Sequence, residues 1–272
     1  MNWLVDAHVH YHPDFGWARF LNGALENTAR ISASTPFAET LSATCLLLAD
    51  PAGVDSLRDL LAASDDALPP GWRLQVLEGG AVSLTPAEPG PPLLLVPGRQ
   101  VRTRERLELL ALDSTLRIPD GLSLEETAEA AREGGAISIL PWGFGKWWLA
   151  RGRVISDMLD TARELGLHVG DNGNRPGGSP RPRLLARARR EGILDLPGSD
   201  PLPFPGHARR AASFGFLVPG DPDRSRPGSV VRAGLASFAE TGESPPSVEA
   251  GRRGALAFAG DQLRMQLHRV SP

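Results

Sequence analysis

Short apolar runs recur along this chain, and most of them end in a polar motif rich in glycine or proline. Runs of this length are typical of buried strands. The runs cover residues 3–10, 41–49, 93–96, 106–112, 136–140, 167–170 and 193–196. Apolar residues at a helical spacing follow most of them, at residues 17–30, 54–63, 124–132, 154–165, 183–191 and 207–214. Strands that alternate with helices predict an α/β fold with a mainly parallel sheet.

The number of strands favours a distorted TIM-like (β/α) barrel of about seven strands, in which the polar motifs meet at one mouth. Residues 72–101 break the alternation, because Gly79-Gly80 separates two short strand-like runs as in a hairpin. We therefore expect a small antiparallel β elaboration at 72–101 within a barrel domain of residues 1–220. Residues 221–272 carry little chemical signal and are expected to pack on the barrel as a C-terminal extension.

The first strand contains the run Asp6-Ala7-His8-Val9-His10, around which we expect the chain to be organised. Side chains alternate along a strand, so Asp6, His8 and His10 share one face. Two imidazoles two residues apart at a strand end can bind one metal ion, and an aspartate on the same face can orient or join them. This run favours a metal site over a strand with hydrogen-bonded core histidines.

Composition narrows the class of protein. The chain has 272 residues, 41% hydrophobic and 22% charged, which suits a single large α/β domain. Its net charge of −3 gives no indication of nucleic acid or of an anionic membrane. No apolar run approaches the ~18 residues of a membrane span, and we expect no signal peptide, because the predicted first strand begins almost at once. We expect a cytoplasmic protein whose single cysteine, Cys45, is a buried thiol.

Four motifs together resemble the PHP (polymerase and histidinol phosphatase) family of metal-dependent hydrolases over roughly residues 1–215. The opening H-x-H is at residues 6–10, and Gly198-Ser199-Asp200 is similar to the late G-S-D motif of that family. Residues 97–100 resemble its third motif, and residues 140–141 fall where it often has His-Pro. The resemblance implies a seven-stranded distorted barrel with up to three metal ions, and often a phosphoesterase activity.

The chain also departs from the PHP pattern at positions where the family has metal ligands or leads to one. These positions are occupied by Pro51, Gln100, Leu140 and Pro201. The ligand types that remain are His8, His10 and Asp200. They are too few for a three-metal cluster but suit one divalent ion, zinc or manganese, with an open position for water.

Two further residues are candidate catalytic groups beside Asp200, which we predict as the third ligand or as a base. His168 lies in the run 167–170, on the face opposite to Leu167 and Val169, and is either a fourth ligand or a hydrogen-bonded core residue. Asp171 and Asn172 end the same run. Either of them orients a ligand or a water molecule, or both belong to an ordinary D-N-G-N turn.

The loop after the run 136–140 is rich in aromatic residues. Trp142, Trp147 and Trp148 surround Lys146, and they either plug the barrel or form the wall of a substrate pocket. Arg99 and Arg175 also fall near the predicted mouth. Arginine and lysine suit phosphate or carboxylate groups, so we predict Arg99, Lys146, Trp142, Trp147 and Arg175 as substrate-binding residues.

These observations predict a PHP-like metal-dependent hydrolase that acts on a phosphoester or another small anionic substrate, with no nucleic-acid or membrane partner. The ion would lower the pKa of a bound water towards ~7. The first alternative is a catalytically silent PHP-like barrel that binds an anionic ligand, which the missing ligands favour. The second is an amidohydrolase-type barrel, which also opens with H-x-H but needs further histidines on its middle strands. The survival of His8, His10 and Asp200 together favours the enzyme.

Overall fold

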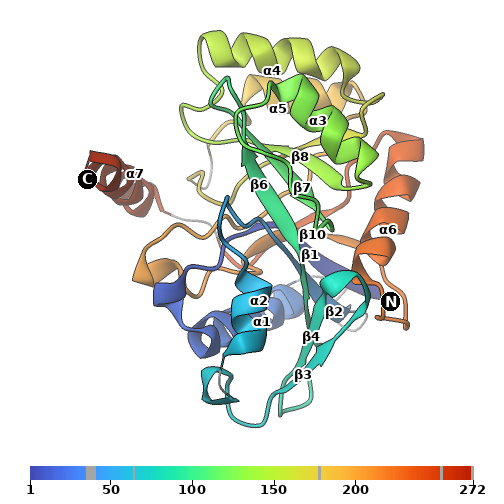
Figure 1. The fold of residues 1–272 in the computed structure, drawn as a ribbon, viewed down its shortest axis with the longest axis vertical. Helices are drawn as coiled ribbons and strands as arrows, with labels where there is room; N and C mark the ends of the chain where they lie inside the picture. The colour runs from blue at the N-terminus through green and yellow to red at the C-terminus, as the bar shows by residue number, and fades with distance from the viewer. Residues whose placement is uncertain (35–40, 64, 177–178, 252–253, 271–272) are drawn as a thin grey trace.

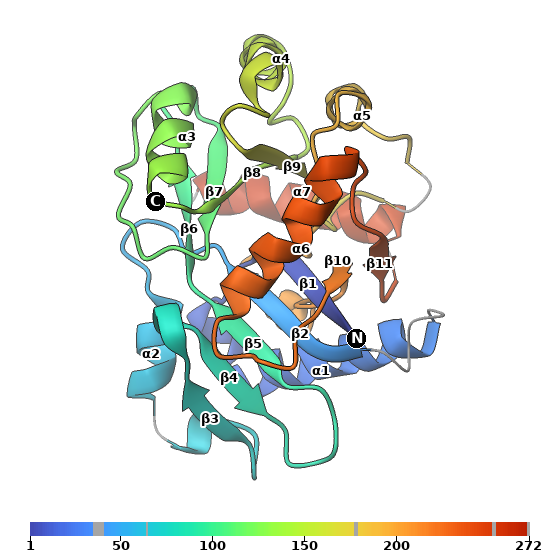
Figure 2. The same ribbon diagram turned by 90° about the vertical axis from the view of Figure 1, so that its right-hand side faces the viewer.

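The computed structural model describes residues 1–34, 41–63, 65–176, 179–251 and 254–270, which form a mixed α/β fold with two sheets (Figures 1 and 2). The larger sheet has the strand order β11 (Ser247–Glu249), β10 (Phe214–Pro219), β1 (Asn2–Val9), β2 (Leu41–Leu48), β5 (Leu93–Val96), β4 (Val82–Thr85) and β3 (Arg73–Val76). The smaller sheet has the order β6 (Gly98–Arg102), β7 (Glu108–Leu112), β8 (Ile137–Pro141) and β9 (Leu167–Gly170).

The helices of the described residues are α1 (Trp17–Ser34), α2 (Ser56–Ala62), α3 (Leu124–Glu133), α4 (Ala150–Thr161), α5 (Arg183–Arg190), α6 (Pro227–Thr241) and α7 (Ala255–Val270). Helices α1 and α3 to α5 pack against the outer faces of the two sheets, whereas α6 packs against the core between them (Figures 1 and 2). The predicted capping box is confirmed at the start of α3, where the Ser123 hydroxyl accepts from the backbone N–H of Glu126 and the Glu126 carboxylate accepts from that of Ser123. The predicted hairpin is confirmed by the antiparallel pair β3–β4.

The predicted closed TIM-like barrel is wrong. Parallel pairs occur between β1 and β2, between β2 and β5, and between β8 and β9, but the remaining ladders are antiparallel. At the edges of the smaller sheet, isolated bridges such as Asp50–Arg99 and Val169–Asp195 stand where a barrel needs continuous ladders. Residues 193–196, which were predicted as a strand, contribute only the bridge at Asp195.

A second correction concerns residues 207–214, for which the spacing of apolar residues predicts a helix. The structure has a single 3-10 turn, Pro205–His207, and then the strand β10. This strand pairs antiparallel with β1, with Leu217 opposite Leu4. β10 therefore begins only at the last residue of the predicted helix, and the buried Ala208, Ala211 and Ala212 lie in the turns before it. The strand gives β1 a neighbour on each side.

Three apolar cores hold the layers together. Phe20 and Leu21 of α1 pack against the outer face of the larger sheet. The core between the sheets includes Trp3 and Val5 of β1 with Ile139 of β8. The third core joins the smaller sheet to α3, α4 and α5. Among the described residues, no helix combines the length and the apolar character needed to cross a membrane.

Candidate metal centre

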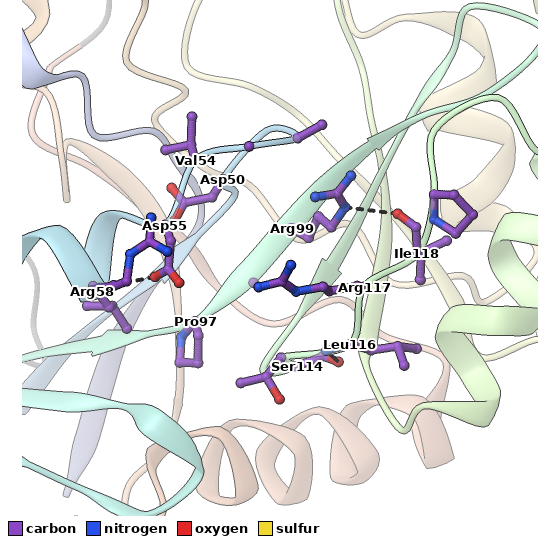
Figure 3. Close-up of a pocket in the computed structure, with 16 residues that line it drawn as sticks. Asp50, Val54, Asp55, Arg58, Pro97, Arg99, Ser114, Leu116, Arg117 and Ile118 are labelled. Carbon is purple, nitrogen blue, oxygen red and sulfur yellow. Dashed lines mark hydrogen bonds between the residues drawn. The ribbon is translucent and has the colours of Figure 1, made fainter.

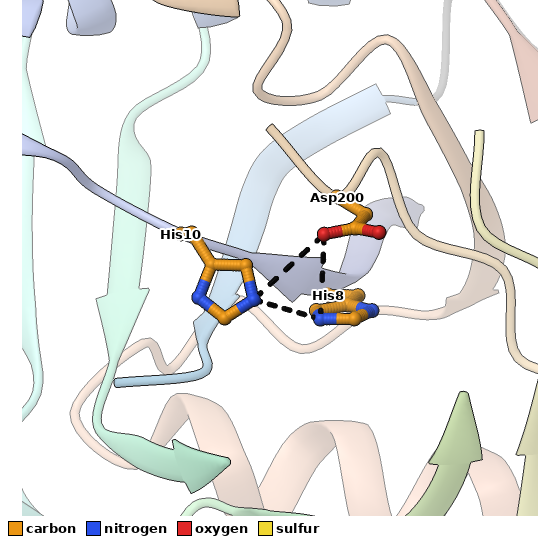
Figure 4. A group of neighbouring side chains, drawn as sticks. All are labelled: His8, His10 and Asp200. Carbon is orange, nitrogen blue, oxygen red and sulfur yellow. Dashed lines mark hydrogen bonds and ion pairs between the residues drawn. The ribbon is translucent and has the colours of Figure 1, made fainter. Parts of the chain in front are cut away.

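The carboxyl end of β1 brings the two predicted histidines together. His8 is buried and His10 is half-buried, and their Nε2 atoms lie 3.0 Å apart (Figure 4). The pairing of β1 with β2 shifts register between Asp6 and Val9, which indicates a β-bulge at this point. Val9 packs in the α1 core, whereas Trp3 and Val5 pack between the sheets. Bulges redirect side chains near functional sites, so this one helps to aim the histidines.

Asp200 reaches the histidines from the turn that follows residues 193–197. Its Oδ1 lies 3.7 Å from Nε2 of His8 and 3.8 Å from Nε2 of His10 (Figure 4). The backbone N–H of Asp200 donates to the carbonyl of His8 at 2.8 Å. Asp200 has a φ of 44°, a left-handed conformation that a non-glycine residue keeps only when its surroundings hold it there.

Two asparagine side chains hold the other oxygen of Asp200. The Nδ2 groups of Asn172 and Asn174 donate to Asp200 Oδ2 at 2.9 and 3.1 Å. Asn174 Nδ2 also lies 2.9 Å from the backbone carbonyl of Asp200. These bonds occupy Oδ2 and leave Oδ1 directed at the histidines. Sequence reasoning treated Asn174 as turn chemistry only. The signal it missed was a pair of asparagines two residues apart after a strand.

Asp6 fixes the position of the Asp200 turn relative to β1. Its carboxylate is fully buried and accepts from the backbone N–H and the hydroxyl of Ser199 at 2.8 and 2.6 Å. It also accepts from the N–H groups of Ala212 at 2.8 Å and of His8 at 3.3 Å. Burial raises the pKa of Asp6 to about 7, although these hydrogen bonds act in the opposite direction. Asp6 thus holds the Asp200 turn against β1 and does not belong to the group of candidate ligands.

The electrostatic state of the site suits a metal cation. Burial, followed by the neighbouring His8, lowers the pKa of His10 to about 4, so that its ring is neutral near pH 7. Burial disfavours the charged form of Asp200, but His8, His10, Lys146 and the amide of Asn172 together hold its pKa far below the usual value. A neutral imidazole and an ionised carboxylate are the forms in which these groups bind metals.

The three residues form a group whose ligand atoms lie within 4.8 Å of one another, and it can hold a metal ion. The edges of the triangle are 3.0, 3.7 and 3.8 Å. Ligands of a tetrahedral ion at about 2.0–2.2 Å are separated by roughly 3.3–3.6 Å, so the triangle fits one zinc-sized ion. Three protein ligands leave a fourth position for another molecule, which is the pattern of catalytic rather than structural metal sites.

The structure places the two other catalytic candidates outside this group. His168 is on β9 in register with Ile139, so its ring lies on the face that packs between the sheets. Asp171 forms an ion pair with Arg175, whose Nη2 lies 2.6 Å from Asp171 Oδ2. The carbonyl of Asp171 accepts from Gly198 at 3.0 Å, which ties the Asp171 loop to the Asp200 turn. The catalytic roles of His168 and Asp171 remain predictions.

The position of His168 has a consequence for stability. Burial lowers its pKa to about 4, below an ordinary value of 6.5. Between these values the unfolded chain binds a proton that the folded chain excludes. The free energy of unfolding should therefore fall as the pH drops from about 6.5 to about 4, by an amount on the order of 2 kcal/mol.

A His168→Leu variant should lose this part of the pH dependence, because leucine cannot bind a proton. Urea unfolding of both proteins at several pH values between 4 and 7 measures the effect. Equal slopes of unfolding free energy against pH in the two proteins would show that the ring of His168 is solvated.

Arg99 and Arg175 are largely occupied by contacts within the protein. Arg99 donates to the carbonyl of Ile118 at 3.0 Å and pairs with Asp120, at the edge of a pocket of about 540 Å³ that Arg58 and Arg117 also line (Figure 3). Arg175 is buried, and its guanidinium contacts Asp171 and two backbone carbonyls.

The aromatic loop holds the remaining predicted substrate-binding residues. Lys146 forms an ion pair with Glu108, a residue that the sequence did not single out. Trp142 and Trp147 are almost fully buried in the core of the smaller sheet, whereas Trp148 is exposed. The described residues form no closed barrel for this loop to plug, but its buried rings pack in this core and also line a pocket. The substrate-binding roles stay predictions.

No protein-family model matches the chain, and no curated protein matches it either. Several solved structures resemble the fold, and two of them illustrate the level of similarity. PsfC from Pseudomonas syringae PB-5123 is 15% identical, with a TM-score of 0.47 over 84% of this chain and 88% of that chain. Endonuclease Q in complex with a 27-mer duplex substrate is 15% identical, with a TM-score of 0.46 over 86% of this chain and 57% of that chain. Similarity at this level assigns neither a family nor an activity.

The second comparison corrects the prediction of a small anionic substrate and no nucleic-acid partner. The endonuclease Q structure contains a duplex substrate with an abasic lesion at the active site. A net charge of −3 does not exclude such a partner, because binding depends on the local charge around a site and not on the sum over the chain. The exclusion that was drawn from composition is therefore withdrawn.

Proposed function

We propose that this protein is a metal-dependent hydrolase that cleaves phosphoester bonds, with His8, His10 and Asp200 as the ligands of one divalent ion. The observation that supports the proposal most is the convergence of the three ligand atoms, at 3.0 to 3.8 Å, where β1 ends. The bonds from Asn172 and Asn174 to Asp200 support it further, because oriented outer partners are typical of metal sites.

The three candidate ligands and Lys146 have different roles in the proposed hydrolysis. The Nε2 atoms of His8 and His10 and Oδ1 of Asp200 would hold the ion. Zinc or manganese at this position would polarise a phosphoryl oxygen and make water a nucleophile near neutral pH. Lys146 lies close enough to Asp200 to lower the pKa of that carboxyl, so its charge also favours an anionic transition state at the site.

Metal analysis combined with turnover tests the proposal. The purified protein should contain about one divalent ion per chain, and a strong chelator should remove both the ion and the hydrolysis of p-nitrophenyl phosphate or bis-p-nitrophenyl phosphate. Adding back zinc or manganese separately should restore activity and identify the ion. A protein that binds neither metal and hydrolyses neither ester contradicts the proposal.

A further inference from the structure

A pocket of about 550 Å³ lies between the loop after β8, the loop after β9 and helix α7. Its aromatic walls are Trp142, Phe144, Trp147, Trp148 and Phe258. Phe144 packs edge-on against Trp148 and Phe258, with ring centroids 4.9 and 5.4 Å apart. The exposed fractions of Phe144 and Trp148 are 50% and 54%, so a ligand would cover apolar surface that now faces water.

The two loops that line the aromatic pocket, after β8 and after β9, also carry residues that act on the candidate metal centre. The loop after β8 carries Lys146, whose charge acts on Asp200 and which lies in the sequence between Phe144 and Trp147, two residues that line the pocket. The loop after β9 holds Asp200 through Asn174, and the next residue, Arg175, lines the pocket. Each of the two loops therefore carries one residue that acts on Asp200 and at least one residue that lines the pocket.

The polar groups of the pocket indicate the kind of ring that it accepts. None of the described residues that line it is acidic. Arg183 lines it as an exposed residue, and among the contacts of the described residues it has no ion pair. A guanidinium beside aromatic faces favours a flat, electron-rich ring with acceptor atoms over an aliphatic chain.

We propose that this aromatic pocket binds a flat aromatic ring of the substrate, a nucleobase or an aryl group, while the phosphoester lies at the metal centre. The inference rests on the proposed function and names the substrate class of that site. Stacking on aromatic side chains tolerates different rings, because each ring offers a π-face. The exposed rings of Phe144 and Trp148 are the stacking partners, and Arg183 contacts the edge of the ring.

Calorimetry with two non-hydrolysable probes tests the inference separately from catalysis. Phenylphosphonate and methylphosphonate carry the same anionic group, and only the first has a ring. The zinc-loaded protein should bind phenylphosphonate at least about tenfold more tightly, as expected for one stacked ring. Trp148→Ala and Phe144→Ala should each reduce this ratio by about fivefold or more. Leu256→Ala, at a position of α7 that is 91% exposed and outside the pocket, should leave the ratio as in the wild type.

A further arm separates the two sources of the ring. A six-residue thymidylate strand is compared with an abasic strand of equal length: tighter binding of the former assigns a nucleobase, and equal binding assigns a simple aryl group. Equal affinity for phenylphosphonate and methylphosphonate, in a protein that still hydrolyses p-nitrophenyl phosphate, would overturn the pocket inference alone. A wild-type protein that binds no metal and hydrolyses no ester would instead overturn the proposed function.

Discussion

Replacing His8 or His10 with alanine is expected to remove the bound divalent ion and to reduce kcat/KM for phosphoester hydrolysis by at least about 100-fold. Each histidine supplies one nitrogen lone pair, and alanine has none. The two remaining ligands bind the ion too weakly to compete with its hydration by water. Metal analysis and turnover of bis-p-nitrophenyl phosphate, measured on the same samples, check the result.

His12→Ala is the matched control for these variants. His12 follows His10 by two residues and its ring lies near that of His10, but its Nε2 contacts the carbonyl of Pro201 at 3.1 Å. This variant should keep the ion. Circular dichroism should show folded protein for all three variants, because the ligands lie at the end of β1 and the apolar cores stay intact. Retention of the ion by both His8→Ala and His10→Ala would refute the ligand assignment.

Gly198→Ala is expected to destabilise the protein by on the order of 3 kcal/mol or more and to lower metal affinity. A Cβ at Gly198 would lie 2.3 Å from the backbone nitrogen of His8 and 2.6 Å from its Cβ. Backbone cannot move aside as the end of a flexible side chain can. The Asp200 turn would therefore have to shift away from β1, and the triangle of ligands would open. Urea unfolding and a metal titration measure the two effects.

Gly206→Ala provides the comparison for this variant. Gly206 lies in the same segment after Asp200, and a Cβ there would meet no atom within 4 Å. Its unfolding free energy should stay within about 0.5 kcal/mol of the wild type. A Gly198→Ala protein as stable as Gly206→Ala would show that the turn does not pack on β1 as closely as the structure places it.

Much of the secondary structure could be predicted from local pattern, and the larger arrangement could not. The capping box at Ser123 and the hairpin of β3 and β4 depend on residues close in sequence, and both predictions are confirmed. The prediction of a barrel was wrong because an apolar run does not indicate whether its strand pairs parallel or antiparallel with its neighbours. The run of β10 is short and carries no such signal, yet it lies antiparallel to β1.

The candidate site also has a part that local sequence predicts and a part that it does not. The order of residues in β1 places two imidazoles at one strand end, since alternation is a local property. Asp200 was reached only by resemblance to a motif, and of its two asparagine partners only Asn172 was considered as an orienting residue. Asn174 and Glu108 acquire their neighbours through contacts between loops, which no spacing within one segment encodes.

The sequence by itself determined the α/β class, the histidine pair and the chemistry of the three candidate ligands, because side-chain alternation and ligand type are local properties. The tertiary structure alone decided that there are two sheets and no closed barrel, and that Asp171 and Arg175 pair with each other. It also decided how Asp200 meets the histidines. That approach requires a glycine at 198 against the backbone of His8 and a buried Asp6 that accepts hydrogen bonds from Ser199. Such contacts join residues far apart in the chain, and only the packed fold brings them within range.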